Sequence, residues 1–114
     1  MIKHIVMWSV RGDDVATRAR NVALLKTEFE SLRGRVPGLL KLEIGVDFSR
    51  IDYACDVVLY SEFASREALA EYAEHPEHQR VKRALGNLRT ARHQVDYEVE
   101  HELTPERAAV APAP

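Results

Sequence analysis

The sequence is poor in several features that mark large classes of protein. It has one cysteine, Cys55, among 114 residues, which excludes an internal disulfide and a cysteine-rich metal site. No apolar run approaches the ~18 residues that a membrane-spanning helix needs. The opening residues also lack the long apolar stretch of a signal peptide. We therefore expect a cytoplasmic protein without a membrane partner.

The sequence also lacks an excess of positive charge and the common nucleotide-binding motifs. Sixteen Lys and Arg against 18 Asp and Glu give a net charge of −2, whereas nucleic-acid-binding domains generally carry a basic surplus. Residues 53–60 do not contain the basic-Gly-aromatic run of RNA-recognition strands. Gly-rich phosphate loops, serine elbows and dinucleotide fingerprints are missing too. Nucleic-acid binding, nucleotide chemistry and triad hydrolysis are therefore not expected.

What is present is a series of clear secondary-structure patterns. Period-two alternation and β-branched or aromatic content predict strands, and three- to four-residue spacing predicts helices. Asp13 or Asp14 and Ser65 are candidate N-caps, and His75-Pro76 should break the second helical region. The predicted strands are residues 2–10, 39–48, 53–60 and 91–103, and the predicted helices are residues 14–33, a short piece from 65, and 76–88.

The order strand, helix, strand, strand, helix, strand predicts an α+β protein of ferredoxin-like βαββαβ plan. Its four-stranded antiparallel sheet would carry the helices on one face and leave the other bare. Since residues 2–10 are apolar on both faces, we expect a homodimer that packs through the bare sheet face. The length suits one domain, over residues 1–103, followed by a flexible Ala/Pro-rich tail at 104–114.

Two sequence motifs add a family resemblance. The opening IKHIVMW of residues 2–8 and the YAEHPEH of residues 72–78, together with the closing VDY of residues 95–97, resemble the stress-responsive dimeric α/β-barrel (Dabb) family. The resemblance covers roughly residues 1–100. It implies a homodimer whose two sheets close into a barrel, with a pocket in each subunit between sheet and helices. Many members of the family are known only for stress response.

The resemblance extends to olivetolic acid cyclase-type members, which cyclise a linear polyketide by an aldol reaction without a cofactor. Their catalytic Tyr and His fall on Tyr72 and His78, and their first-strand pocket histidine falls on His4. A further pocket histidine falls at or near Asp56, where this sequence departs from the cyclases. The resemblance thus implies related chemistry and leaves the same substrate in doubt.

The residue types suit that chemistry. A histidine can remove a proton α to a carbonyl, and a tyrosine hydroxyl can stabilise the enolate oxygen. Tyr72 and His78 are six residues apart, which a straight helix would not place on one face, but a break at His75-Pro76 could turn them together. The alternative is that Tyr72 only anchors its helix and His78 is solvated. The predicted substrate-binding residues are His4, Trp8, Tyr53 and Asp56.

Other charged groups have structural interpretations beside functional ones. His4 among apolar residues is a pocket group or a buried structural histidine. His75 and His78 are too weak a pair to predict a metal, and we expect neither a metal nor another cofactor. Residues 80–92 carry five cations and no acid, either an anion-attracting patch or a solvated helix face. Glu98, Glu100 and Glu102 suggest a charged, protected sheet edge.

The leading hypothesis is a homodimer with a small hydrophobic pocket that performs acid–base chemistry on a keto, polyketide-like substrate. In it His78 is the base, Tyr72 polarises the carbonyl and His4 orients the substrate. One alternative is a non-catalytic stress-response or small-ligand-binding homodimer whose histidines are structural. A further alternative is a haem or quinol monooxygenase-like enzyme of the same fold.

Overall fold

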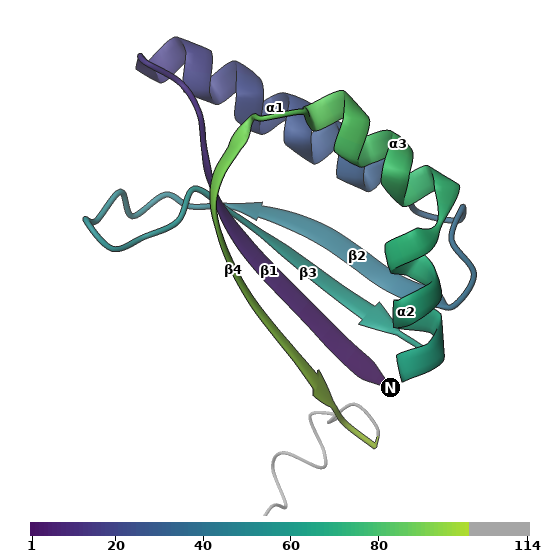
Figure 1. Ribbon diagram of the computed structural model, residues 1–114. Coiled ribbons are helices and arrows are strands. Elements are labelled where there is room, and N and C mark those ends of the chain that lie inside the picture. Colours follow the sequence, from purple (N-terminus) through teal and green to yellow (C-terminus); the bar gives the residue numbers. More distant parts are fainter. Residues whose placement is uncertain (101–114) are drawn as a thin grey trace, which may run out of the picture.

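The computed structural model describes residues 1–100, in which three helices cover one face of a four-stranded antiparallel sheet (Figure 1). The strands lie in the order β2-β3-β1-β4. This arrangement confirms the predicted ferredoxin-like fold. The elements in chain order are β1 (Ile2–Val10), α1 (Val15–Glu30), β2 (Leu39–Val46), β3 (Val57–Phe63), α2 (Arg66–Glu74), α3 (Pro76–Leu85) and β4 (Arg89–Glu98).

The helices begin where the sequence places capping residues. Asp14 and Ser65 adopt extended backbone angles, and their side chains accept main-chain N–H groups of the first turns of α1 and α2. The predicted break between α2 and α3 is confirmed. His75 is extended, with φ −66° and ψ 137°, because the following Pro76 disfavours helical geometry there. Pro76 itself takes the first position of α3, where no N–H is needed.

The strand ends differ from the predicted ones. β2 ends at Val46 and not at residue 48, and β3 begins at Val57 and not at residue 53. β4 begins two residues earlier than expected, at Arg89, and ends at Glu98. The sequence pattern predicts that this strand continues to residue 103, but Val99 and Glu100 are already outside the strand. Residues 101–103, with Glu102, and the predicted tail at 104–114 lie outside the described residues.

Asp56 explains the late start of β3. Its carboxylate accepts the main-chain N–H of Val10 at 2.7 Å and the guanidinium of Arg50 at 2.7 Å. Its own N–H donates to the carbonyl of Trp8 at 2.9 Å. The chain just before it closes a turn, with the N–H of Ala54 bonded to Ile51. These bonds tie the end of the β2–β3 connection to β1 and satisfy the buried polar groups there. The chain makes a turn at residues 51–54, and β3 begins only after Asp56.

The core lies between the helices and the helix-facing side of the sheet. Alternate residues of β1 point into it, as the period of two requires. Buried residues of β2 and β3 lie beside them on the same face of the sheet, and buried residues of all three helices pack against this face. Its largest fully buried side chains include Val6, Leu25, Phe29, Leu32, Leu59, Phe63 and Val81.

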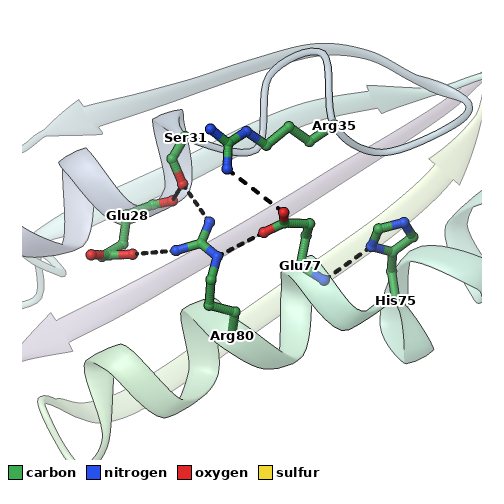
Figure 2. Close-up of polar contacts among 6 residues, drawn as sticks. All are labelled: Glu28, Ser31, Arg35, His75, Glu77 and Arg80. Atoms are coloured by element: carbon green, nitrogen blue, oxygen red, sulfur yellow. Dashed lines mark hydrogen bonds and ion pairs between the residues drawn. The ribbon is translucent and has the colours of Figure 1, made fainter.

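A polar network fastens α3 to the C-terminal part of α1 (Figure 2). The guanidinium of Arg80 donates to Glu28 at 2.9 Å, to Glu77 at 2.7 Å and to the hydroxyl of Ser31 at 2.8 Å. Arg35 approaches Glu77 from the other side. Because one guanidinium satisfies three acceptors from two helices, the network holds the start of α3 in a defined position.

The opposite face of the sheet has no helix of residues 1–100 on it (Figure 1). The register places Ile5 and Met7 of β1 beside Val95 and His93 of β4 on this side. Exposed fractions of 39% for Met7, 51% for Val95 and 43% for Tyr97 show that apolar surface is left open. No helix in the described part of the chain has both the length and the apolar character to cross a membrane.

Candidate functional site

A small cavity lies between the helix-facing side of the sheet and the helices. Its volume is about 50 Å³, enough for a few water molecules or the end of a small organic molecule. Its walls combine apolar side chains, two imidazoles, a phenol and three cations. The lining residues are His4, Val6, Trp8, Phe29, Leu59, Tyr72, His78, Lys82, Arg89 and Arg92.

The break between α2 and α3 brings Tyr72 and His78 together. Tyr72 lies in the last turn of α2 and His78 in the first turn of α3. Six residues of straight helix would turn the two side chains to different faces. With His75 extended between them, their ring centroids approach to 4.3 Å at an interplanar angle of 37°. The structure thus makes neighbours of the two residues predicted to be catalytic.

The hydrogen bonding of His78 defines its tautomer. Its Nδ1 lies 3.1 Å from the carbonyl oxygen of Ala73, and since a carbonyl only accepts, Nδ1 carries the proton. Burial lowers the pKa of His78 below its usual value, and the charges of Lys82 and Arg89 lower it further. His78 is therefore a neutral imidazole near pH 7, with the lone pair of Nε2 available to accept a proton.

Tyr72 has the opposite character. Burial raises the pKa of its phenol well above the usual value, and the nearby charges of Arg89 and Arg92 offset this only in part. Its ring packs between Phe63, at 5.0 Å between centroids, and His78. Among residues 1–100 no fully buried side-chain nitrogen or oxygen lacks a hydrogen-bond partner, and no hydrogen bond joins the hydroxyl of Tyr72 to another of these residues. The hydroxyl oxygen therefore reaches the cavity that Tyr72 lines. A protonated phenol at a cavity wall is a hydrogen-bond donor for a bound oxygen atom.

His4 is held by the carboxylate of Asp96, a residue of the closing VDY motif to which the sequence analysis gave no role of its own. Its Nδ1 donates to Oδ1 of Asp96 at 2.5 Å, and the side chain of His4 is only 7% exposed. The register of β1 and β4 pairs these two residues directly. A carboxylate bound to one ring nitrogen fixes the tautomer and leaves the other nitrogen as an acceptor. His4 thus lines the cavity with a defined orientation.

Trp8 forms an aromatic wall of the cavity. Its indole stacks on Phe29, with 5.1 Å between centroids and 24° between planes. The guanidinium of Arg89 lies over the indole at 5.1 Å and over Phe29 at 5.9 Å, distances at which a cation is attracted to a ring face.

The structure places Tyr53 and Asp56 away from the cavity of Tyr72 and His78. Tyr53 is 89% exposed and belongs to the projecting β2–β3 connection (Figure 1). It lines a separate hollow of about 490 Å³, whose walls include Met7 and His93 from the helix-free face. Asp56 is bound to Val10 and Arg50. Neither residue lines the cavity of Tyr72 and His78, because the turn at residues 51–54 points the chain away from it.

The two histidines at the helix break have different partners. His75 Nδ1 accepts the N–H of Glu77 and caps α3 (Figure 2), whereas His78 Nδ1 donates to Ala73. Among residues 1–100, no three His, Cys, Asp or Glu side chains form a group able to hold a metal ion.

Sequence reasoning assigned no site role to three cations that line the cavity, nor to the carboxylate that holds His4. Asp96 entered the sequence analysis only as part of the closing VDY motif. Lys82, Arg89 and Arg92 entered it only as members of the five-cation segment 80–92, interpreted as an anion-attracting patch or a solvated helix face. The alternation of residues 91–103 does indicate that Arg92 and Asp96 lie on the same face of their strand. Only the pairing of β4 with β1 shows that this face lies beside His4 and Trp8.

Comparison with known proteins agrees with this architecture. Residues 2–99 match the sequence model of the Stress responsive A/B Barrel Domain, or Dabb, family. The chain belongs to this family. The Dabb match spans nearly all of the described residues and confirms the family predicted from the motifs. No functionally curated protein sequence matches the chain.

Solved structures similar to this Dabb chain share its fold. A dimeric protein of unknown function with a ferredoxin-like fold from Bacteroides fragilis is 30% identical, with a TM-score of 0.76 over 86% of this chain and 95% of that one. A dimeric ferredoxin-like protein from Jannaschia is 26% identical, with a TM-score of 0.68 over 86% and 98%. The hydroxynitrile lyase of Passiflora edulis is 11% identical, with a TM-score of 0.72 over 90% and 96%, and shows the fold alone.

Proposed function

We propose that this Dabb protein is a homodimer in which each subunit performs cofactor-independent acid–base chemistry on a keto compound. The observation that carries the proposal is the contact between His78 and Tyr72 at one cavity. One is a neutral imidazole with a free Nε2, and the other is a phenol that keeps its proton. A base and a hydrogen-bond donor side by side are the groups needed to form and stabilise an enolate.

The reaction would begin with a proton transfer to His78, and it would end with the return of a proton from the resulting imidazolium to the product. Nε2 of His78 removes a proton from the carbon next to the carbonyl, and the electron pair of that C–H bond moves to the carbonyl oxygen. The hydroxyl of Tyr72 donates a hydrogen bond to the oxygen as its negative charge develops. His4, oriented by Asp96, lines the same cavity and would position the substrate against the two catalytic groups. The enolate then takes an electrophilic carbon or regains a proton.

The cavity supports a small substrate, or the reactive end of a longer one. Its 50 Å³ is well below the ~300–1,000 Å³ of typical ligand sites. A polyketide, as the resemblance to olivetolic acid cyclase-type members implies, would place only its reacting carbonyl there. The small volume also favours a second candidate, a non-catalytic stress-response dimer whose histidines support the fold.

Hydrogen exchange separates the two candidates. We expect the protein to speed the replacement of α-hydrogens by deuterium in a panel of small diketones and oxo acids, followed by proton NMR in D₂O. Tyr72→Phe keeps the packed ring and loses the donor, so the acceleration should fall by about 10²–10³-fold. Thermal stability should stay close to that of the unchanged protein, because the phenyl ring keeps the contacts with Phe63 and His78 and only the cavity-facing hydroxyl is removed.

Two results would contradict the catalytic proposal. One is a folded dimer that gives no exchange above buffer for any compound of the panel, which supports the non-catalytic candidate. The other is equal acceleration by the unchanged protein and by Tyr72→Phe. Oxygen consumption with a quinol, in place of exchange, would favour the monooxygenase-like alternative.

The homodimer is proposed to form through the helix-free face of the sheet. Exposed apolar side chains gather there, and similar structures from Bacteroides fragilis and Jannaschia are described as dimeric. Two such faces brought together would bury the apolar surface that a single subunit leaves in water. By symmetry each residue near the axis would then meet its own copy or a neighbour of it.

We expect Val95→Asp to convert the dimer to a monomer. Val95 is half-exposed in one subunit, so the carboxylate is tolerated there, but a dimer would bury two such charges against apolar side chains. Sedimentation velocity at micromolar concentration measures the result. The control is Leu24→Asp, at a 40% exposed position on α1 of the helix layer, which should remain dimeric. An unchanged dimer of Val95→Asp would place the interface elsewhere.

A further inference from the structure

Three of the cavity's lining residues are cations that no carboxylate of residues 1–100 neutralises. Lys82, Arg89 and Arg92 line it together, and within the described chain none of them forms an ion pair. Other cations of the same segment behave differently. Arg80, for example, is bound to Glu28 and Glu77. The cations of residues 80–92 therefore fall into two groups. Arg80 binds carboxylates of the helix layer, whereas Lys82, Arg89 and Arg92 line the cavity.

Arg89 is the most unusual of the three. Its guanidinium is half-buried and lies over Trp8 and Phe29, close to a second cation. Burial and the charge of Arg92 both lower its pKa. Removing a charge from water without a counter-ion is costly, and an anion bound in front of the guanidinium would remove that cost.

A chain of hydrogen bonds links this cationic side of the cavity to His4. Arg92 donates to the amide oxygen of Gln94, and the amide nitrogen of Gln94 donates to Asp96 at 3.0 Å. Asp96 in turn holds His4. All of these side chains but that of His4 come from the helix-facing side of β4. An anion at Arg92 would thus lie at one end of a network that orients a histidine of the site.

We propose that Lys82, Arg89 and Arg92 bind the carboxylate of a small oxo acid whose carbonyl lies against Tyr72 and His78. Planar guanidinium groups match a carboxylate, which accepts two parallel N–H bonds. The apolar wall of Val6 and Leu59 next to them suits a short carbon chain. This assignment rests on the proposed function, for which it names the substrate class. It also explains why a protein of net charge −2 gathers three cations at one small cavity.

Binding of acetoacetate, followed by the imidazole signals of His78 in NMR titrations, tests the assignment. We expect saturable binding, and since a bound anion stabilises the imidazolium, the pKa of His78 should rise in the complex. Arg92→Gln and Arg89→Gln should each weaken binding by about 10- to 100-fold. Arg92→Lys keeps the charge and should retain most of the affinity. Arg83→Gln, at an exposed position of α3 that does not line the cavity, should leave binding unchanged.

Comparison ligands separate recognition of the carboxylate from recognition of the carbonyl groups. Acetylacetone, which has the carbonyls without the carboxylate, should bind much more weakly than acetoacetate. Equal binding of the two, or equal binding by Arg92→Gln and the unchanged protein, would overturn the assignment. Inorganic phosphate that binds as tightly as acetoacetate would also overturn it, in favour of a general oxyanion site.

The same experiments separate this assignment from the proposed function. In one possible result, acetoacetate binds through the arginines but its α-hydrogens do not exchange. This result would support the carboxylate site and contradict the proposed catalysis. In the opposite result, neutral diketones exchange as fast in Arg89→Gln and Arg92→Gln as in the unchanged protein, and acetoacetate binds no better than acetylacetone. This result would support the proposed catalysis and contradict the carboxylate site.

Discussion

His78→Asn should lower kcat/KM for α-hydrogen exchange by about 10²–10⁴-fold, the range that a positioned general base contributes. The asparagine amide is not basic at neutral pH and cannot take the proton. The side chain of His78 is only partly buried and its one hydrogen bond goes to a main-chain carbonyl. We therefore expect the variant to fold and to form the same dimer as the unchanged protein. Steady-state kinetics and sedimentation measure the two properties.

A matched control lies three residues away in the same motif. His75→Asn removes the other imidazole of the helix break but keeps a side-chain oxygen that can cap α3, as Nδ1 of His75 does now. Its activity should stay within a few-fold of the unchanged protein. An equal fall in activity in His75→Asn and His78→Asn would mean that both histidines only support the structure of the helix break, and that His78 is not the base.

The pH dependence gives a second test of the same residue. A base works in its neutral form, and burial with the charges of Lys82 and Arg89 lowers the pKa of His78. The rate of exchange should therefore not change with pH around pH 7. It should fall only below pH 6.5, the ordinary pKa of a histidine. The free energy of unfolding should change with pH in the same direction as the rate. The stabilising contribution of neutral His78 is complete above pH 6.5 and is lost as the pH falls through the lower pKa that His78 has in the folded state. Both effects should disappear in His78→Asn.

Trp8→Ala should lower the free energy of unfolding by about 3–5 kcal/mol, as for other large aromatic side chains removed from a core. Trp8 is 3% exposed, stacks on Phe29 and supports Arg89. A domain of this size has a total stability of about 5–15 kcal/mol, so the melting temperature should drop by roughly 15–25 °C. Thermal denaturation followed by circular dichroism measures the change.

Trp8→Phe shows whether the residue also contacts substrate. A phenyl ring keeps the stacking on Phe29 and most of the buried area, so the loss of stability should be much smaller than in Trp8→Ala. If Trp8 shapes the cavity, KM should change in Trp8→Phe while the fold is retained. A fall in melting temperature of less than about 4 °C in Trp8→Ala, equivalent to about 1 kcal/mol, would contradict the place of Trp8 in the core.

Much of the fold could be predicted because local patterns and tertiary packing agree. The alternation in residues 2–10 corresponds to a strand with one face in the core, and the caps Asp14 and Ser65 lie where the helices begin. The break at His75-Pro76 follows from the geometry of proline alone. Strand ends were less predictable. Residues 53–56 have the composition of a strand, but a turn at residues 51–54 and the bonds of the Asp56 side chain to Val10 and Arg50 delay the start of β3 to Val57.

Some features of the candidate site could be predicted from the sequence, and others could not. The sequence by itself determined that a tyrosine and a histidine flank a helix break and that a histidine lies on the buried face of the first strand. It determined the family as well, through motifs whose spacing is local. Only the tertiary structure decided that Asp96 holds His4, that three cations of residues 80–92 face the cavity, and that Tyr53 and Asp56 do not. The physical reason is strand register: contacts between β1 and β4 join residues far apart in the chain, such as His4 and Asp96, and no local pattern records that pairing.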